Sequence, residues 1–211
     1  MTLLRIGDIL RMGSYKAYKE TESLIEDIFI NAINYRMKPE VKIIPQYNAE
    51  VRGMRFRLDF VFEYGSERIG VECDGKEFHN KARDLWRDSI LLGEKKLDVI
   101  YRFYGTDIYN RIFECVYLIY FHHKNFFPDD EGKAIILAVS EDFASNQNEF
   151  MKEEMQIFID FYNEAKIKFQ KTFYATRRTA GTRKAKAIYE AIGDLTAPSI
   201  EELAQKVKSK L

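Results

Sequence analysis

The segment MRFRLDFVFEYGSERIGVECD, residues 54–74, contains two alternating runs separated by a Gly-Ser pair. Apolar side chains occur at every second position, in the first run up to Phe62 and in the second from Ile69 to Cys73. This period is typical of half-buried strands. Gly65 and Ser66 suit a two-residue turn whose first position requires a positive φ. The segment therefore predicts an antiparallel β-hairpin.

The turn also predicts the register of the hairpin. With Gly65 and Ser66 in the turn, the apolar residues of both runs fall on one face, as expected for a half-buried hairpin. On the other face Asp59 lies opposite Glu72, and Arg57 lies opposite Asp74. Directly opposed residues have Cβ atoms about 4.5–5.5 Å apart. Two carboxylates placed so closely repel each other unless a positive charge lies between them.

A divalent cation is one way to relieve this repulsion. Mg²⁺ and Mn²⁺ prefer hard oxygen ligands, so either ion suits a site between Asp59 and Glu72. The alternative is that the two carboxylates are solvated, or are neutralised by Arg55 and Arg57 on the same face.

The flanking sequence predicts a mixed sheet with helices. Helical spacing of apolar residues predicts helices over 21–37, with Thr21 as the cap, and over 81–92 and 106–121. Strands are predicted over 42–51 and 98–103, and a further strand over 134–139. This order of elements predicts an α/β (α+β) core, residues 1–140, built on one mixed sheet.

The remainder, residues 141–211, is predicted to be a helical, basic C-terminal extension. Its first helix, 148–171, is apolar on more than one side, so it either packs on the core or forms a homodimer or partner interface. The net charge of the chain is zero, yet residues 165–188 carry eight lysines and arginines and no acid. We expect this stretch to hold the phosphate backbone of nucleic acid, with contacts from Arg177, Arg178, Arg183, Lys184 and Lys186. The alternative is that these cations pair with the acidic run at 141–154.

The composition excludes several classes of protein. The chain has 211 residues, of which 46% are hydrophobic and 31% charged, which is unlike disordered or collagen-like sequences. Its two cysteines do not form the disulfide framework of a small secreted domain. No stretch approaches the roughly 18 apolar residues of a membrane span. We therefore expect a soluble, cytoplasmic protein without a membrane partner.

Five short segments extend the argument from the hairpin to a family. In chain order they are ESLIE (22–26), RLDFV (57–61), VECDGKEFH (71–79), DLWRD (84–88) and YRFYGTDI (101–108). Together they resemble the PD-(D/E)XK nuclease superfamily, in the branch related to the very-short-patch repair endonuclease. The resemblance covers about residues 20–120. It implies a restriction-endonuclease-like mixed sheet flanked by helices, and Mg²⁺- or Mn²⁺-dependent hydrolysis of DNA.

The resemblance also implies a set of site residues. Asp59, Glu72 and the backbone carbonyl of Cys73 would bind the metal. Glu26 on the first helix would complete the acidic site, with Glu22 as the alternative because it lies one turn away on the same face.

The sequence departs from the family pattern at one important position. Asp74 stands where the family has a lysine that orients or deprotonates the attacking water and balances charge. We expect Lys76 or Arg87 to supply this cation instead. Asp74 itself is a metal ligand or a partner of Arg57.

Two further residues have weaker signals. His79 is a candidate general base or phosphate donor, with helix capping or packing as the alternative. Arg102 is a candidate phosphate contact, with an ion pair on the sheet face as the alternative.

The sequence thus predicts a metal-dependent endonuclease acting on DNA, in defence or repair. The missing lysine supports a second hypothesis, in which the nuclease site has decayed and the fold binds nucleic acid or a partner protein.

Overall fold

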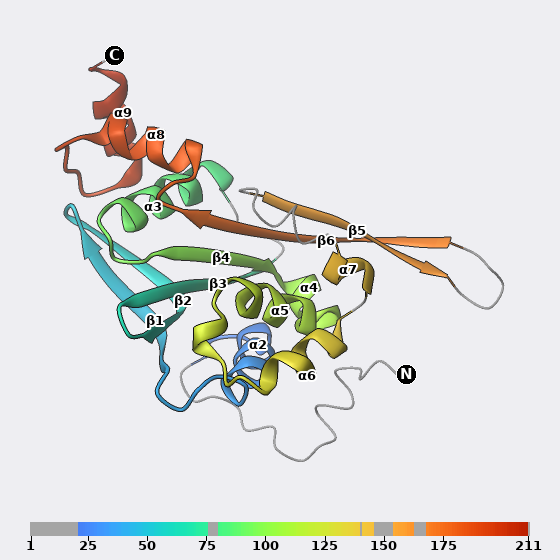
Figure 1. Ribbon diagram of the computed structural model, residues 1–211. Coiled ribbons are helices and arrows are strands. Elements are labelled where there is room, and N and C mark those ends of the chain that lie inside the picture. Colours follow the sequence, from blue (N-terminus) through green and yellow to red (C-terminus); the bar gives the residue numbers. More distant parts are fainter. Residues whose placement is uncertain (1–20, 76–79, 140, 146–153, 163–167, 211) are drawn as a thin grey trace.

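The computed structural model describes residues 21–75, 80–139, 141–145, 154–162 and 168–210. They form one six-stranded sheet with the strand order β1-β2-β3-β4-β6-β5, covered by helices on both faces (Figure 1). The strands are β1 (Lys42–Val51), β2 (Met54–Tyr64), β3 (Glu67–Asp74), β4 (Val99–Tyr104), β5 (Glu154–Tyr162) and β6 (Lys168–Thr179). Only β3 and β4 run parallel, and the other neighbouring pairs are antiparallel. The sheet is therefore mixed, as the sequence predicts.

Two groups of helices cover the two faces of the sheet, as Figure 1 shows. The first group is α2 (Leu24–Asn34), α4 (Gly105–Asn110), α5 (Ile112–His122), the 3₁₀ helix η1 (Lys124–Phe126), α6 (Glu131–Ala138) and α7 (Glu141–Ser145). The second group is α3 (Lys81–Gly93), α8 (Arg183–Ile192) and α9 (Ile200–Lys208). Helix α3 makes the crossover between the parallel strands β3 and β4.

Each face of the sheet has its own apolar core. Phe29 of α2 and Val116 of α5 pack with Phe60 on the first face, and Ile90 of α3 and Leu203 of α9 pack with Leu58 on the second. None of the helices in the described ranges is long and apolar enough to cross a lipid bilayer.

The β2–β3 hairpin confirms the predicted turn. Gly65 has a φ of 61°, and Tyr64 pairs with Glu67. The ladder ends at the pair Phe60–Val71, one residue before the two acids. At that point the backbone N–H of Cys73 donates to Oδ2 of Asp59, at 2.7 Å. The strands therefore separate where the sequence places the acidic site.

The prediction that all apolar residues of the hairpin share one face is wrong. Leu58 packs in the second core, whereas Phe60 packs in the first. The change of face coincides with an irregular position on the neighbouring strand β1, where Gln46 has a φ of 47°. A strand covered on both faces does not need strict alternation to bury its apolar residues.

The largest difference from the sequence prediction lies in the C-terminal part. The predicted helix over 148–171 is wrong, because β5 and β6 form an antiparallel hairpin that joins β4 through β6. Met155, Ile157, Ile159 and Phe161 recur at every second position, which is the period of a strand. Aromatic and β-branched residues also favour strands.

Two smaller predictions also fail. The predicted strand over 134–139 is helix α6, with Ile136 and Leu137 exposed at its surface. The predicted cap Thr21 is replaced by Ser23. The C-terminal helices α8 and α9 are present, and their apolar residues pack in the second core.

Candidate functional site

The two acids of the hairpin lie at the point where β2 and β3 separate. Burial, together with the charges of Glu72, Glu26 and Asp74 and against the hydrogen bond from Cys73, raises the pKa of Asp59 from 3.8 to about 7. Burial also raises the pKa of Glu72 to about 7, against the opposing charge of Arg87. The side chain of Cys73, by contrast, packs against the apolar core on the first face of the sheet. Glu72 is thus buried and Asp59 half-buried, and the charge of Glu72 raises the pKa of Asp59.

Helix α2 brings Glu26 to this pair. The sequence Ser23-Leu-Ile-Glu26 is a capping box, in which Ser23 Oγ accepts from the N–H of Glu26, at 3.2 Å, and donates to Glu26 Oε1, at 2.8 Å. Gln46 Nε2 donates to the other carboxylate oxygen, at 2.9 Å. Glu26 is 6% exposed. Its position is therefore determined by the helix start as well as by the site.

Glu22, the alternative to Glu26, is engaged elsewhere. Its two carboxylate oxygens accept from the two terminal nitrogens of Arg57, each at 2.8 Å. The expected pairing of Arg57 with Asp74 is therefore wrong. Asp74 Oδ1 lies 3.4 Å from Arg102 Nη1 instead.

A buried ion cluster lies between α3 and the sheet. Asp88 is fully buried and accepts from Arg102 through both oxygens, at 2.8 and 3.1 Å, and from Arg178. The side chains of Arg102 and Arg178 are both 7% exposed. For Arg102 this is the ion pair on the sheet face that the sequence offers as the alternative to a phosphate contact. Arg178, which the sequence predicts as a phosphate contact, is held by Asp88 as well.

Arg87 lies between this cluster and the acidic pair. Its Nη2 is 2.7 Å from Glu72 Oε1 and 3.9 Å from Asp84 Oδ1. The Glu72 Oε1 atom is buried and makes no hydrogen bond, so the contact is one of charge. Of the two cations predicted to replace the family lysine, Arg87 is beside Glu72. Lys76 lies outside the described residues, as does His79.

The basic C-terminal stretch divides into two parts. Arg177 is partly buried and donates from Nε to the hydroxyl of Tyr101, at 3.2 Å. Arg183, Lys184 and Lys186 are exposed on α8. Only the part on α8 presents these predicted nucleic-acid contacts at the surface.

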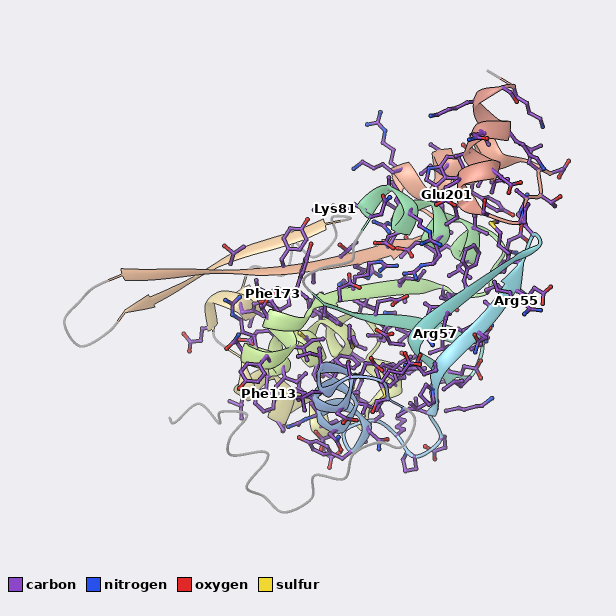
Figure 2. All side chains as sticks on the ribbon, turned by 180° about the vertical axis from the view of Figure 1, so that it is seen from behind. Arg55, Arg57, Lys81, Phe113, Phe173 and Glu201 are labelled. Atoms are coloured by element: carbon purple, nitrogen blue, oxygen red, sulfur yellow. The ribbon has the colours of Figure 1, made fainter. Side chains whose placement is uncertain are left out.

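Two clefts lie on either side of Asp84, which lines both of them. The first cleft has a volume of about 300 Å³ and is lined by Met54, Arg55, Phe56, Arg57, Arg83, Asp84, Arg87, Pro198, Ser199 and Ile200. The second has a volume of about 270 Å³ and is lined by Asp74, Lys81, Asp84, Leu85, Arg102, Tyr104, Tyr174, Thr176, Arg178 and Lys184. Figure 2 shows Arg55 and Arg57 along β2, with Lys81 and Glu201 on the side of α3 and α9.

Sequence reasoning missed Arg83, Lys81 and the two tyrosines of these clefts. Arg83 lies four residues before Arg87 on α3, so helical spacing could have found it. Tyr104 and Tyr174 come from β4 and β6, and their rings meet edge to face with centroids 4.9 Å apart. Local periodicity gives no sign of such a long-range contact.

The donor set fits a cation that keeps part of its water shell. Within the described ranges, no three acidic, histidine or cysteine side chains are grouped closely enough to hold a metal ion. Mg²⁺ is usually bound by only one or two carboxylates, with water and substrate phosphate completing the shell. Asp59 and Glu72 can supply these carboxylates, and a bound cation would share Glu72 with Arg87, whose Nη2 lies 2.7 Å from Glu72 Oε1.

The raised pKa of Asp59 predicts how stability depends on pH. Its folded pKa, about 7, exceeds 3.8, so the folded protein binds more protons and loses stability as the pH rises from about 4 to 7. Asp59→Asn removes this penalty and keeps an acceptor for the N–H of Cys73. We expect the variant to unfold at a higher temperature than the parent at pH 8 in EDTA, with a smaller difference at pH 5. A difference that is independent of pH would contradict this account.

Comparisons with known proteins do not assign this chain to a family. No family model matches the chain, and no curated protein or solved structure is similar enough to count as a match. The mixed α/β architecture follows from the order and pairing of the strands.

Proposed function

We propose that this protein is a metal-dependent nuclease that hydrolyses DNA phosphodiester bonds. One observation carries the proposal. Glu72 is buried and Asp59 half-buried where two strands separate, and both pKa values are raised to about 7, with burial as the largest cause. Such a pair is costly for the fold and is relieved by a divalent cation, which favours a functional role.

The residues around the pair have complementary roles in this proposal. A bound Mg²⁺ or Mn²⁺ ion supplies a Lewis acid and a bound water of lowered pKa. The N–H of Cys73 holds Asp59, and Ser23 and Gln46 hold Glu26, whose charge acts on Asp59. Arg87, beside Glu72, stabilises the negative charge that develops on the phosphate.

The direct test is cleavage of plasmid and single-stranded DNA by the purified protein. We expect cleavage with Mg²⁺ or Mn²⁺ and none with EDTA. Comparison of the two substrates establishes strand preference. Cleavage that continues in EDTA would refute the metal-dependent mechanism.

One observation favours a second candidate, a decayed nuclease module that binds DNA or a partner protein. Arg87 lies 2.7 Å from Glu72, and Arg102 lies 3.4 Å from Asp74. These two acids are therefore already paired with arginines of the protein itself. This candidate predicts DNA binding that is unaffected by Mg²⁺, without cleavage under any condition.

Arg87 offers a test of the replacement for the family lysine. If Arg87 acts on the transition state, Arg87→Ala lowers kcat by about a hundredfold or more and changes DNA affinity much less. Lys76→Ala is the matched variant at the other predicted position. Steady-state kinetics with a labelled oligonucleotide separates the two parameters. Unchanged kcat in both variants would exclude both residues from this role.

A further inference from the structure

We infer that the first cleft, between β2, α3 and the start of α9, binds a backbone phosphate of the nucleic-acid strand. This inference rests on the proposed function in taking nucleic acid as the ligand. It assigns substrate binding to Arg57, Arg83 and Arg87, whereas the sequence predicts that the basic C-terminal stretch binds the phosphate backbone.

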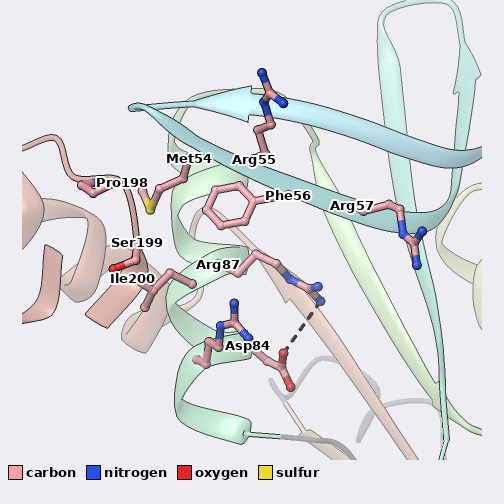
Figure 3. A pocket seen from close by; sticks show the side chains of 10 residues that line it. Met54, Arg55, Phe56, Arg57, Asp84, Arg87, Pro198, Ser199 and Ile200 are labelled. Carbon is pink, nitrogen blue, oxygen red and sulfur yellow. Dashed lines mark ion pairs between the residues drawn. The ribbon is translucent and has the colours of Figure 1, made fainter. Parts of the chain in front are cut away.

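The charged residues that line the first cleft favour an anionic ligand. Four of the ten lining residues are arginines, and Asp84 is the single acid among them. Figure 3 shows Arg87 and Asp84 facing the strand that carries Phe56 and Arg57, while Arg55 extends from the other side of that strand. A guanidinium presents a planar fork that matches the oxygens of a phosphate.

The ion pairs of these arginines can be exchanged for a phosphate at little cost. Arg57 pairs with Glu22 through side chains that are 55% and 54% exposed. Arg83 lies 3.7 Å from Glu201, and their side chains are 65% and 64% exposed. A single exposed contact such as Arg83–Glu201 contributes little to stability, because water and salt screen it. The Arg57–Glu22 pair is bidentate and therefore stronger, but its exposure to solvent leaves it open to exchange with a phosphate. Both arginines are thus available to a stronger anion.

The third arginine connects the cleft to the acidic pair. Arg87 lines the cleft, and its guanidinium lies 2.7 Å from Glu72. An anion held by Arg87 is therefore adjacent to the proposed site of hydrolysis.

The residues of the second cleft favour a nucleic-acid strand, rather than a single ion, as the ligand of the first cleft. Asp84 lines both clefts, and the second also contains Lys81 and Lys184. Cations in two neighbouring clefts that share Asp84 suit consecutive phosphates of one strand. A free phosphate ion would occupy only one cleft.

The test measures DNA binding in EDTA, where no cleavage can occur. Fluorescence anisotropy of a labelled 20-base-pair duplex and of its single strand gives the affinity across a salt series. For Arg57→Ala/Arg83→Ala we expect about tenfold weaker binding at moderate salt. We also expect a salt slope that is shallower by roughly 1.8 for the duplex and roughly 1.4 for the single strand.

The matched control removes two exposed lysines from the opposite face of the molecule. Lys124→Ala/Lys133→Ala changes the net charge equally, at η1 and α6. We expect its affinity and slope to equal those of the parent. Thermal unfolding of both double variants checks that the fold is intact.

Several outcomes would overturn the inference. The cleft is not a nucleic-acid site if both double variants bind DNA alike. It is a small-anion site if Arg57→Ala/Arg83→Ala loses affinity for inorganic phosphate but keeps its affinity for DNA. If the parent never cleaves but the double variant loses DNA binding, the inference stands and the proposed hydrolysis fails.

Discussion

Asp59→Asn and Glu72→Gln are each expected to reduce DNA cleavage about a thousandfold or more, because a metal that stabilises the transition state contributes several kcal/mol. Both substitutions preserve size and remove one charge. The loss should therefore come with weaker Mn²⁺ binding, measured by calorimetry, and with an intact fold.

Glu63→Gln is the matched control for this experiment. Glu63 lies on the same strand, β2, and pairs with Arg68 at 2.7 Å, away from the acidic pair. We expect this variant to cleave DNA at the rate of the parent. Parental activity in Asp59→Asn, or unchanged Mn²⁺ binding in both acid variants, would refute the shared metal site.

The second large effect is expected at Asp88. Asp88→Ala leaves the guanidinium groups of Arg102 and Arg178 without their buried partner. Breaking a buried ion pair in this way costs about 3–5 kcal/mol. In a protein of this size the midpoint of thermal unfolding should fall on the order of 10 °C.

Asp84→Ala is the control for this variant, because Asp84 is on the same helix but its side chain is 21% exposed. We expect a much smaller decrease in the unfolding temperature. Adding Arg178→Met to Asp88→Ala should restore part of the loss, because it removes one of the uncompensated charges. A decrease of similar size at both acids would show that burial of Asp88 is not the cause.

The buried ion cluster around Asp88 explains why the DNA-binding test uses variants of Arg57 and Arg83. Arg178 is committed to Asp88 and Arg177 to Tyr101. Substituting them would alter packing as well as charge. Variants at Arg57 and Arg83 avoid this problem, because both side chains are more than half exposed.

The sequence by itself determined the hairpin and the closeness of its two acids. Alternation over 55–62 and 69–73 and the turn at Gly65 are local signals, since each depends on residues within a few positions along the chain. Burial is the main cause of the raised pKa of each acid, and the charge of Glu72, which this register brings near Asp59, adds to the rise in the pKa of Asp59.

Only the tertiary structure decided which cations meet these acids. Arg87 reaches Glu72 and Arg102 of β4 reaches Asp88 because α3, which connects β3 to β4, packs over the sheet. The formation of the C-terminal hairpin also depends on the tertiary structure, since β6 is stabilised by pairing with β4, more than 60 residues earlier in the chain. Such contacts join segments that are distant in sequence, so no local period specifies them. The packing of both faces of the sheet selects them instead.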